Sequence, residues 1–261
     1  MRVESMSENQ TSFLPNVLVN SLPKSGTHLL LQIILGIPGM EITPAWVIED
    51  KDLDMIKPGS VGPAHLVYSS ERALLLKQKN LKVIFISRDL RDVVVSLVHF
   101  IMLNKWGNHP WTPYLTSLKT HDERLLTMIK GVSLSNEQYE EFGITGIPNI
   151  RQFAQDKLGW CKEQGIFSIS FEELVIDEES QQKAIMKIID FLWDDLKLLR
   201  ISKMEILQKI RGNIKPEGSG TFRKGKIGDW KIEFNEEHKK AFKEIAGDLL
   251  IQLGYEKDND W

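Results

Sequence analysis

The segment LPKSGTH, residues 22 to 28, has the residue types of a loop that holds an anion. Asn16 to Leu22 (NVLVNSL) is typical of a short buried strand, and Thr27 to Leu35 predicts a mostly apolar helix. Backbone N–H groups at a helix start carry partial positive charge, so they favour a phosphate or sulfate. Gly26 permits a close turn around such a group and Lys24 adds a positive charge. We therefore predict an anion site here.

The order of residues in this loop differs from that of a Walker A loop, in which the lysine follows the last glycine of GxxxxGK[ST]. Here Lys24 precedes Gly26. The buried strand predicted over Leu81 to Ser87 (LKVIFIS) also runs into Arg88 and not into the aspartate that commonly holds magnesium. A P-loop-type phosphotransferase is therefore the less favoured alternative. On the loop alone, an ordinary strand–helix turn with an exposed lysine stays open.

Two further segments can hold an anion. Arg88 stands at the predicted strand end, and Ser96 lies about two turns up the following helix, so both can face one phosphate. Later in the chain FRKGK supplies Arg223 and Lys224, after a Gly-rich stretch with the composition of a lid that orders on a ligand. Taken singly, each segment also fits a solvated charge cluster.

Together PKSGTHLL, RDLRDVVVSLVHF and FRKGKIGDWK resemble, in content and order, the signature segments of the sulfotransferases that use 3′-phosphoadenosine 5′-phosphosulfate (PAPS). The resemblance extends over residues 17 to 234. It implies that the loop from Lys24 to His28 holds the phosphosulfate and that the arginine and lysine segments hold the 3′-phosphate. The implied nucleotide-binding residues are Lys24, Ser25, Gly26, Thr27, His28, Arg88, Ser96, Phe171, Arg223, Lys224 and Gly225.

The same resemblance implies in-line transfer of a sulfuryl group to a hydroxyl or amine, with release of 3′-phosphoadenosine 5′-phosphate (PAP). It implies that His65, in GPAHLVY on a strand predicted over Val61 to Tyr68, is the general base. The ordinary pKa of histidine, near neutrality, suits that role. Lys24 would stabilise the charge that grows on the departing phosphate. The alternatives are a packing histidine and a protein that binds PAPS or PAP without turning it over.

No metal is expected in this chemistry, because Cys161 is the single cysteine and the sequence shows no cluster of ligands. Among the other histidines, we expect His99 to pack within its helix. The remaining histidines outside the phosphate loop are expected to be solvated: His109, His121 and His238.

Several positions depart from the family pattern. Leu29 stands where a tryptophan commonly stacks on adenine, Pro63 where a lysine is frequent, and Phe171 where the family has a tyrosine. The adenine is therefore expected to be held differently. Glu236 replaces a valine of the family's dimer motif, so we expect a monomer or a weak dimer.

The acceptor is expected to be a small molecule, because aromatic residues gather in two segments predicted as loops over the active face, 41 to 60 and 104 to 148. These aromatic residues are Trp46, Trp106, Trp111 and Tyr114. The first loop also carries Glu41, Glu49, Asp50, Asp52 and Asp54. Our hypothesis is that some of these acids favour a polar or cationic acceptor, and the alternative is a solvated acidic loop.

The elements that must position these residues alternate between strand and helix. A further strand is predicted over Phe167 to Phe171, and helices over 149 to 164, 181 to 200, 202 to 211 and 236 to 253, the last capped by Asn235. This alternation predicts an α/β fold, with a central, mainly parallel sheet flanked by helices in three layers, as in the P-loop-like sulfotransferases. We expect residues 1–15 to be a polar tail and 16–261 a single domain.

Composition limits the class of protein. The 261 residues are 42% hydrophobic and 26% charged, with a formal net charge of −3. That balance predicts a globular protein that does not coat nucleic acid. The first fifteen residues lack the apolar core of a signal peptide, and no apolar run is long enough for a membrane span, so a cytoplasmic protein is expected.

Overall fold

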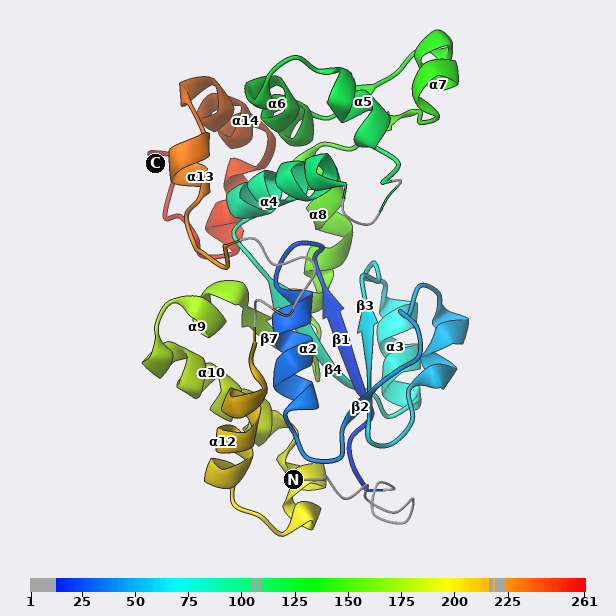
Figure 1. Cartoon of the computed structure of the whole chain (residues 1–261), viewed down its shortest axis with the longest axis vertical. Helices are drawn as coiled ribbons and strands as arrows, with labels where there is room; N and C mark the ends of the chain where they lie inside the picture. The colour runs from blue at the N-terminus through cyan, green and yellow to red at the C-terminus, as the bar shows by residue number, and fades with distance from the viewer. Residues whose placement is uncertain (1–12, 105–106, 108, 216–217, 219–223) are drawn as a thin grey trace. The chain divides into compact units, whose positions relative to one another are not determined.

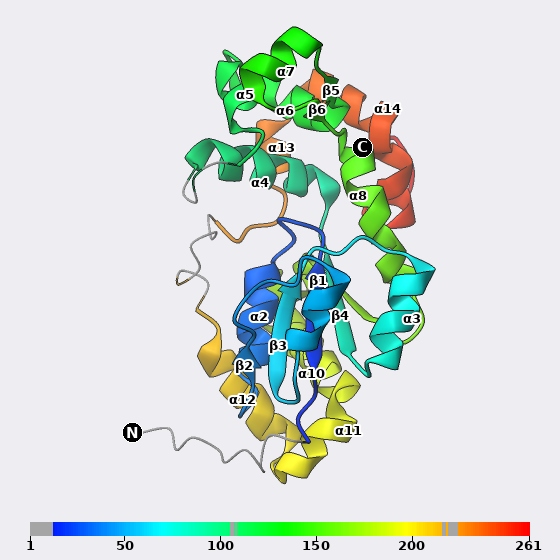
Figure 2. The same cartoon turned by 90° about the vertical axis from the view of Figure 1, so that its right-hand side faces the viewer.

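The computed structural model describes residues 13–104, 107, 109–215, 218 and 224–261. The chain forms two compact units (Figures 1 and 2). Unit 1 consists of Met1–Arg88 and Lys157–Gly225, and unit 2 of Asp89–Asp156 and Lys226–Trp261.

Unit 1 contains a five-stranded parallel sheet with the order β2-β3-β1-β4-β7. Its strands are β1 (Val17–Ser21), β2 (Glu41–Ile42), β3 (Ser60–Ala64), β4 (Lys82–Ser87) and β7 (Phe167–Ser170). The register pairs Asn20 with Ala64, and Ser87 with Ser170. The segments that follow β1, β3, β4 and β7 therefore begin at one edge of the sheet, where ligands bind in folds of this kind.

Helices cover both faces of this sheet. The α-helices of unit 1 are α2 (Thr27–Leu35), α3 (Ser70–Gln78), α9 (Phe171–Val175), α10 (Glu178–Phe191), α11 (Trp193–Leu196) and α12 (Lys203–Asn213), and its 3₁₀ turns are η1 (Asp50–Met55), η2 (Gly159–Lys162) and η3 (Lys197–Leu199). The chain moves outward from β1 through α2 to β3 and back through α3 to β4. Because such crossovers are right-handed, α2 and α3 lie on opposite faces (Figures 1 and 2). The predicted three-layer α/β architecture is confirmed.

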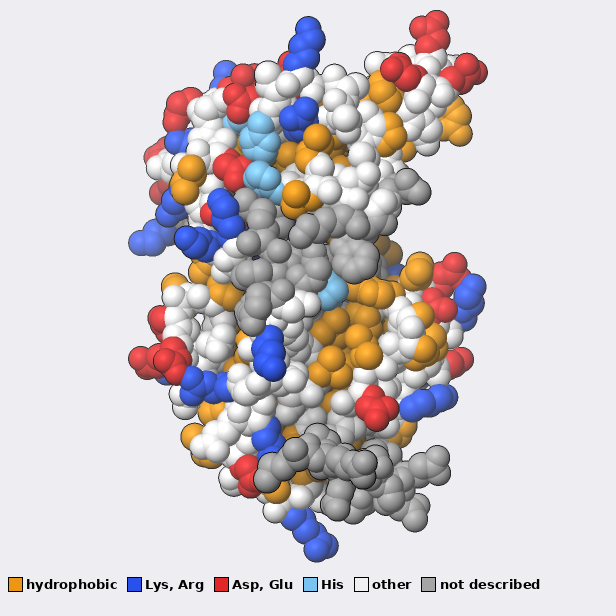
Figure 3. Space-filling view, in the orientation of Figure 1, with side chains coloured by type: hydrophobic (Ala, Val, Ile, Leu, Met, Phe, Trp, Pro, Cys, Tyr) orange, Lys and Arg blue, Asp and Glu red, His pale blue; other side chains and the backbone are white. Residues whose placement is uncertain are grey.

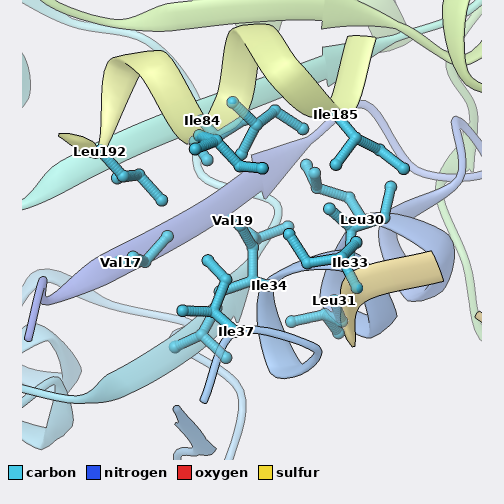
Figure 4. Packing of buried hydrophobic residues seen from close by; sticks show 14 of the residues in the cluster. Val17, Val19, Leu30, Leu31, Ile33, Ile34, Ile37, Ile84, Ile185 and Leu192 are labelled. Atoms are coloured by element: carbon cyan, nitrogen blue, oxygen red, sulfur yellow. The ribbon is translucent and has the colours of Figure 1, made fainter. Parts of the chain in front are cut away.

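The core of unit 1 lies between the sheet and α2, α10 and α12. Val17 and Val19 of β1 pack with Leu30 and Ile34 of α2, all fully buried (Figure 4). Ile185 of α10 belongs to the same cluster. Burying side chains of this size contributes about 1.5–3 kcal/mol each, so α2 is held firmly at the end of the predicted phosphate loop.

Unit 2 is mainly helical. It contains α4 (Leu90–Leu103), α5 (Thr112–Ser117), α6 (His121–Lys130), α7 (Asn136–Phe142), α13 (Trp230–Glu233) and α14 (Glu236–Gln252), the greater part of α8 (Ile150–Leu158), and an antiparallel pair of β5 (Val132–Ser133) with β6 (Gly146–Ile147). The Asn235 side chain accepts a hydrogen bond from the His238 N–H, which confirms the predicted cap of α14.

Some local predictions were wrong. The segment 104–148 is not one long loop, because it contains the short helices α5, α6 and α7. Of these, α6 begins at a capping box formed by Thr120 and Glu123. The segment 41–60 contains β2 and η1, and α3 was not predicted. His238 is fully buried, with Nε2 3.1 Å from the carbonyl oxygen of Asp122, rather than solvated. None of the helices described is both long enough and apolar enough to cross a membrane.

Candidate active site

The predicted phosphate loop leaves β1 and enters α2 through two residues in the left-handed region, Lys24 (φ 70°) and Gly26 (φ 98°). Gly26 is the N-cap of α2 and provides no side chain to cap it. Ser25 is fully buried, and its hydroxyl has no hydrogen-bond partner among the described residues. Buried polar atoms nearly always have partners in native proteins, so this hydroxyl fits a loop built to receive a phosphate or sulfate oxygen.

Arg88 and Phe171 lie beside this loop, because each follows one of the paired strands β4 and β7. The Arg88 guanidinium lies 4.4 Å from the centre of the Phe171 ring, and its Nη1 donates a hydrogen bond of 3.4 Å to the carbonyl oxygen of Lys24. A Cβ atom at Gly26 would lie 2.6 Å from Phe171 Cδ2. The phenyl ring thus contacts both the glycine of the loop and the arginine, and only glycine fits at position 26.

His65 is the first residue after β3, not a residue within a strand as predicted. Its Nδ1 atom lies 2.9 Å from the hydroxyl of Ser21 and 3.1 Å from the carbonyl oxygen of Ser21. A proton on Nδ1 satisfies that carbonyl, and this tautomer leaves the lone pair on Nε2. The imidazole is therefore arranged to accept a proton at Nε2.

The chain next to His65 is held by hydrogen bonds to the backbone of Leu66. The Asn20 side chain accepts from the Leu66 N–H at 2.8 Å and donates to its carbonyl oxygen at 3.2 Å. Trp160 donates its indole N–H to the same carbonyl at 2.8 Å. The sequence did not predict that Asn20, Ser21 and Trp160 hold this part of the site. Asn20 and Ser21 were the available signal, because they are polar residues at the end of the otherwise apolar segment NVLVNSL.

Burial lowers the pKa of His65 to about 4, against an opposing contribution from its hydrogen bond with Ser21. The charges of Lys157, His28 and Lys24 lower it further. The pKa of His28 is also lowered, first by burial and then by the charge of Lys24. His65 is therefore neutral at physiological pH, which is the state that a general base requires.

Trp46 lies against both histidines. Its ring centre is 4.9 Å from that of His65 and 6.0 Å from that of His28. Of the aromatic residues predicted to meet the acceptor, Trp46 is placed beside the candidate base. Trp111 and Tyr114 belong to unit 2, and Trp106 lies outside the described residues.

The remaining predicted nucleotide residues are distributed over both units. Ser96 is a partly buried residue of α4 in unit 2, whereas Lys224 and Gly225 are exposed residues of unit 1. Arg223 lies outside the described residues. Leu29, in the place of the adenine-stacking tryptophan, packs against the core of unit 1. The roles of Ser96, Lys224, Gly225 and Arg223 stay predictions.

Acidic residues of the segment 41–60 have partners of their own. Asp50 pairs with Arg72 at 2.6 Å and Asp54 with Lys79 at 2.6 Å. Asp52 accepts hydrogen bonds from the N–H groups of Ile48 and Glu49 at the start of η1. These carboxylates shape the segment that carries Trp46.

Comparisons with known proteins agree with this geometry. The family model described as the sulfotransferase domain matches residues 14–254. The chain is 27% identical to sulfotransferase 6B1 of Mus musculus, over 92% of this chain and 80% of the mouse protein. It is 24% identical to the 3-beta-hydroxysteroid sulfotransferase of Cavia porcellus, over 85% of this chain and 79% of that protein. Among solved structures, the fold is similar to that of mouse sulfotransferase SULT7A1 complexed with PAP, with a TM-score of 0.59 and 22% identity over 95% of this chain and 89% of that one. The fold is also similar to that of retinol dehydratase in complex with androsterone and PAP, with a TM-score of 0.55. The identity is 16% over 90% of this chain and 80% of that one.

Proposed function

The chain belongs to the sulfotransferase domain family, and on that premise we propose that it transfers a sulfuryl group from PAPS to a hydroxyl or amine of a small molecule and releases PAP. The observation that carries the proposal is the position of His65, which Ser21 holds with Nε2 available, next to a loop that fits an anion. A base and an anion loop at one sheet edge are the parts that sulfuryl transfer requires.

The transfer needs one proton acceptor and one stabilised leaving group. Nε2 of His65 takes the proton from the acceptor hydroxyl or amine as the new bond to sulfur forms. The bond between sulfur and the bridging phosphate oxygen breaks, and its electron pair stays on PAP. Lys24 and the N–H groups at the start of α2 stabilise this growing negative charge, an electrostatic contribution that is often the largest in catalysis.

The nucleotide half of the proposal rests on Arg88. Its guanidinium is held against Phe171 and the loop carbonyl, and it would bind the 3′-phosphate together with Ser96, Arg223, Lys224 and Gly225. Ser25, Gly26, Thr27 and His28 would surround the 5′-phosphosulfate. Position 29 is a leucine that packs against the core of unit 1, so adenine is held without stacking on a tryptophan there.

Calorimetric titration with PAP and with ATP tests the donor. We expect PAP to bind and ATP to bind far more weakly, because the 3′-phosphate is the group that Arg88 would recognise. The Ser25→Ala variant should weaken PAP binding by roughly 10- to 150-fold, the value of a hydrogen bond to a charged group. Tight ATP binding without PAP binding would favour the phosphotransferase alternative and defeat the proposal.

A mass-spectrometric screen of acceptors with PAPS separates an enzyme from a protein that only binds the nucleotide. Because Asp50, Asp52 and Asp54 have structural partners and Glu49 pairs with Lys51 at 2.8 Å, the polar or cationic acceptor that the acidic segment led us to expect rests on Glu41. Comparing the turnover of a cationic alcohol with that of a neutral phenol decides this. Faster turnover of the phenol rules out a role of the acidic segment in selecting the acceptor.

Cellular location and assembly belong to the same proposal. A single cysteine allows no internal disulfide, which suits a reducing compartment, so we propose a cytoplasmic location. Burial raises the pKa of the Cys161 thiol to about 11, so it stays protonated and unreactive there. Glu236 in place of the apolar residue of the dimer motif favours a monomer or weak dimer, which light scattering after gel filtration measures directly.

A further inference from the structure

A second group of polar side chains converges in unit 2. His99 belongs to α4, His121 is the first residue of α6, and Glu233 is the last residue of α13. The His99 Nε2 atom lies 2.9 Å from both carboxylate oxygens of Glu233, and the His121 Nε2 atom lies 2.9 Å from one of them. The two imidazole rings are 5.2 Å apart between centroids. Two imidazoles from separate helices thus face one carboxylate.

We propose that His99, His121 and Glu233 bind a divalent transition metal, with Zn²⁺ as the ion that fits best. Two imidazole nitrogens and one carboxylate oxygen are ligands that Zn²⁺ takes in sites with three protein ligands and one water. Their ligand atoms all lie within 4.8 Å of one another. Around a tetrahedral zinc with bonds of about 2.1 Å, neighbouring ligand atoms lie about 3.4 Å apart. Small side-chain rotations therefore suffice.

Burial and charge at this cluster suit a metal. The Glu233 side chain is only 15% exposed, whereas those of His99 and His121 are 32% and 38% exposed, so one side of the cluster is open to solvent. The Glu233 carboxylate supplies a negative charge on the side of the cluster that faces the two imidazoles. Figure 3 shows histidine side chains beside an acidic one on the surface of unit 2.

A metal here would join three elements that are distant in sequence. The sequence showed no ligand cluster because α4, α6 and α13 contribute one ligand each. The site is separate from sulfuryl transfer and goes beyond the proposed function. Ser96 lies about one turn before His99 on α4, so the metal would also restrain the helix of a predicted nucleotide residue.

The test uses the full chain, freed of metal by a chelator and titrated calorimetrically with zinc chloride. We expect one equivalent to bind with a dissociation constant in the micromolar range or tighter. Glu233→Gln keeps the shape of the side chain and a hydrogen-bond acceptor but loses the charge. It should weaken zinc binding more than the roughly 10- to 100-fold caused by loss of a residue that only hydrogen-bonds to a metal ligand. His109→Ala, also in unit 2 but outside the cluster, is the matched control and should bind zinc like the unmodified protein.

Cobalt substitution gives a second readout. Co²⁺ in the unmodified protein should show the intense visible absorption of a four-coordinate site, and this absorption should disappear in His121→Ala. Circular dichroism of the metal-free variants establishes that they are folded. PAP binding is measured separately, so a protein that binds PAP but not zinc contradicts the metal site without contradicting the proposed function. Absence of zinc uptake, retention of affinity in folded Glu233→Gln, or an equal loss in His109→Ala would each overturn the proposal.

Discussion

The Nδ1 atom of His65 lies 3.1 Å from the carbonyl oxygen of Ser21 and 2.9 Å from its hydroxyl. The Ser21 hydroxyl in turn lies 2.7 Å from the hydroxyl of Thr27, at the start of α2. One residue at the end of β1 therefore links the candidate base to the phosphate loop.

Replacing the base should separate chemistry from binding. In His65→Ala and His65→Gln we expect turnover to fall about 10²- to 10⁴-fold, because proton abstraction from the acceptor is lost. The affinity for PAP should stay within about threefold, since the nucleotide groups are unchanged. Steady-state turnover and calorimetry measure the two effects, with His109→Ala as the control. Full turnover in either variant would remove His65 as the base.

The pH dependence of turnover follows from the lowered pKa of His65, about 4. A base with that pKa stays neutral well below pH 6, so kcat/KM should be nearly equal at pH 7.5 and pH 5.5 and should decline only toward pH 4. An ordinary histidine, with a pKa near 6.5, would leave about a tenth of the base neutral at pH 5.5. A tenfold loss of kcat/KM at pH 5.5 would contradict the assignment.

A methyl group at Gly26 should damage both stability and binding. Gly26 and Gly143 both have positive φ, 98° and 70°, but only Gly26 has a neighbour in the way, Phe171 Cδ2 at 2.6 Å from an added Cβ. Gly143→Ala should cost about 1–2 kcal/mol for the left-handed backbone alone. Gly26→Ala should cost more and should also lose PAP affinity, measured by urea unfolding and calorimetry. Equal costs with unchanged PAP binding would show that the contact with Phe171 is unimportant.

Local patterns predicted the elements of the site better than its hydrogen bonds. The apolar runs of β1, α2 and β4 lie within single segments, so the sequence correctly predicted that residues 22–28 connect a strand to a helix and that Arg88 follows a strand. The pairing of Ser21 with His65 depends on the parallel register that sets Asn20 opposite Ala64, which is a tertiary property. No local pattern carries that register.

The same reason explains the errors in unit 2. The helices between residues 104 and 148 are short, and the residues that separate them resemble the interior of a loop. His99, His121 and Glu233 are distant in sequence, so their convergence depends on the packing of α4, α6 and α13. Sequence alone showed three ordinary polar residues.

Asp92 should be important for the stability of unit 2. It is 1% exposed and accepts hydrogen bonds from the N–H groups of Gly228, at 2.8 Å, and Trp230, at 3.1 Å. Asp92→Ala leaves two donors without this acceptor and should cost about 2–6 kcal/mol, whereas Asp92→Asn keeps one acceptor oxygen and should cost less. Urea unfolding measures both. Asp190→Ala, which removes a surface pair with Lys203, should change stability by less than about 1 kcal/mol.

The acceptor is expected to meet Trp46, whose ring lies 4.9 Å from that of His65. Trp46→Ala removes a large apolar surface beside the base, and loss of about 1.5–3 kcal/mol of binding would raise KM for an apolar acceptor roughly 10- to 150-fold. PAP affinity should not change. Initial rates over a range of acceptor concentrations at saturating PAPS measure this effect.

Trp193→Ala is the matched control, because Trp193 packs under Lys203 and belongs to α11, whose Asp195 pairs with Lys82 at the amino end of β4. It lies in the same unit but at the sheet edge opposite the phosphate loop. A variant there should change KM by less than about twofold. If Trp193→Ala raises KM as much as Trp46→Ala, the effect reflects loss of packing in unit 1, and Trp46 is not part of the acceptor site.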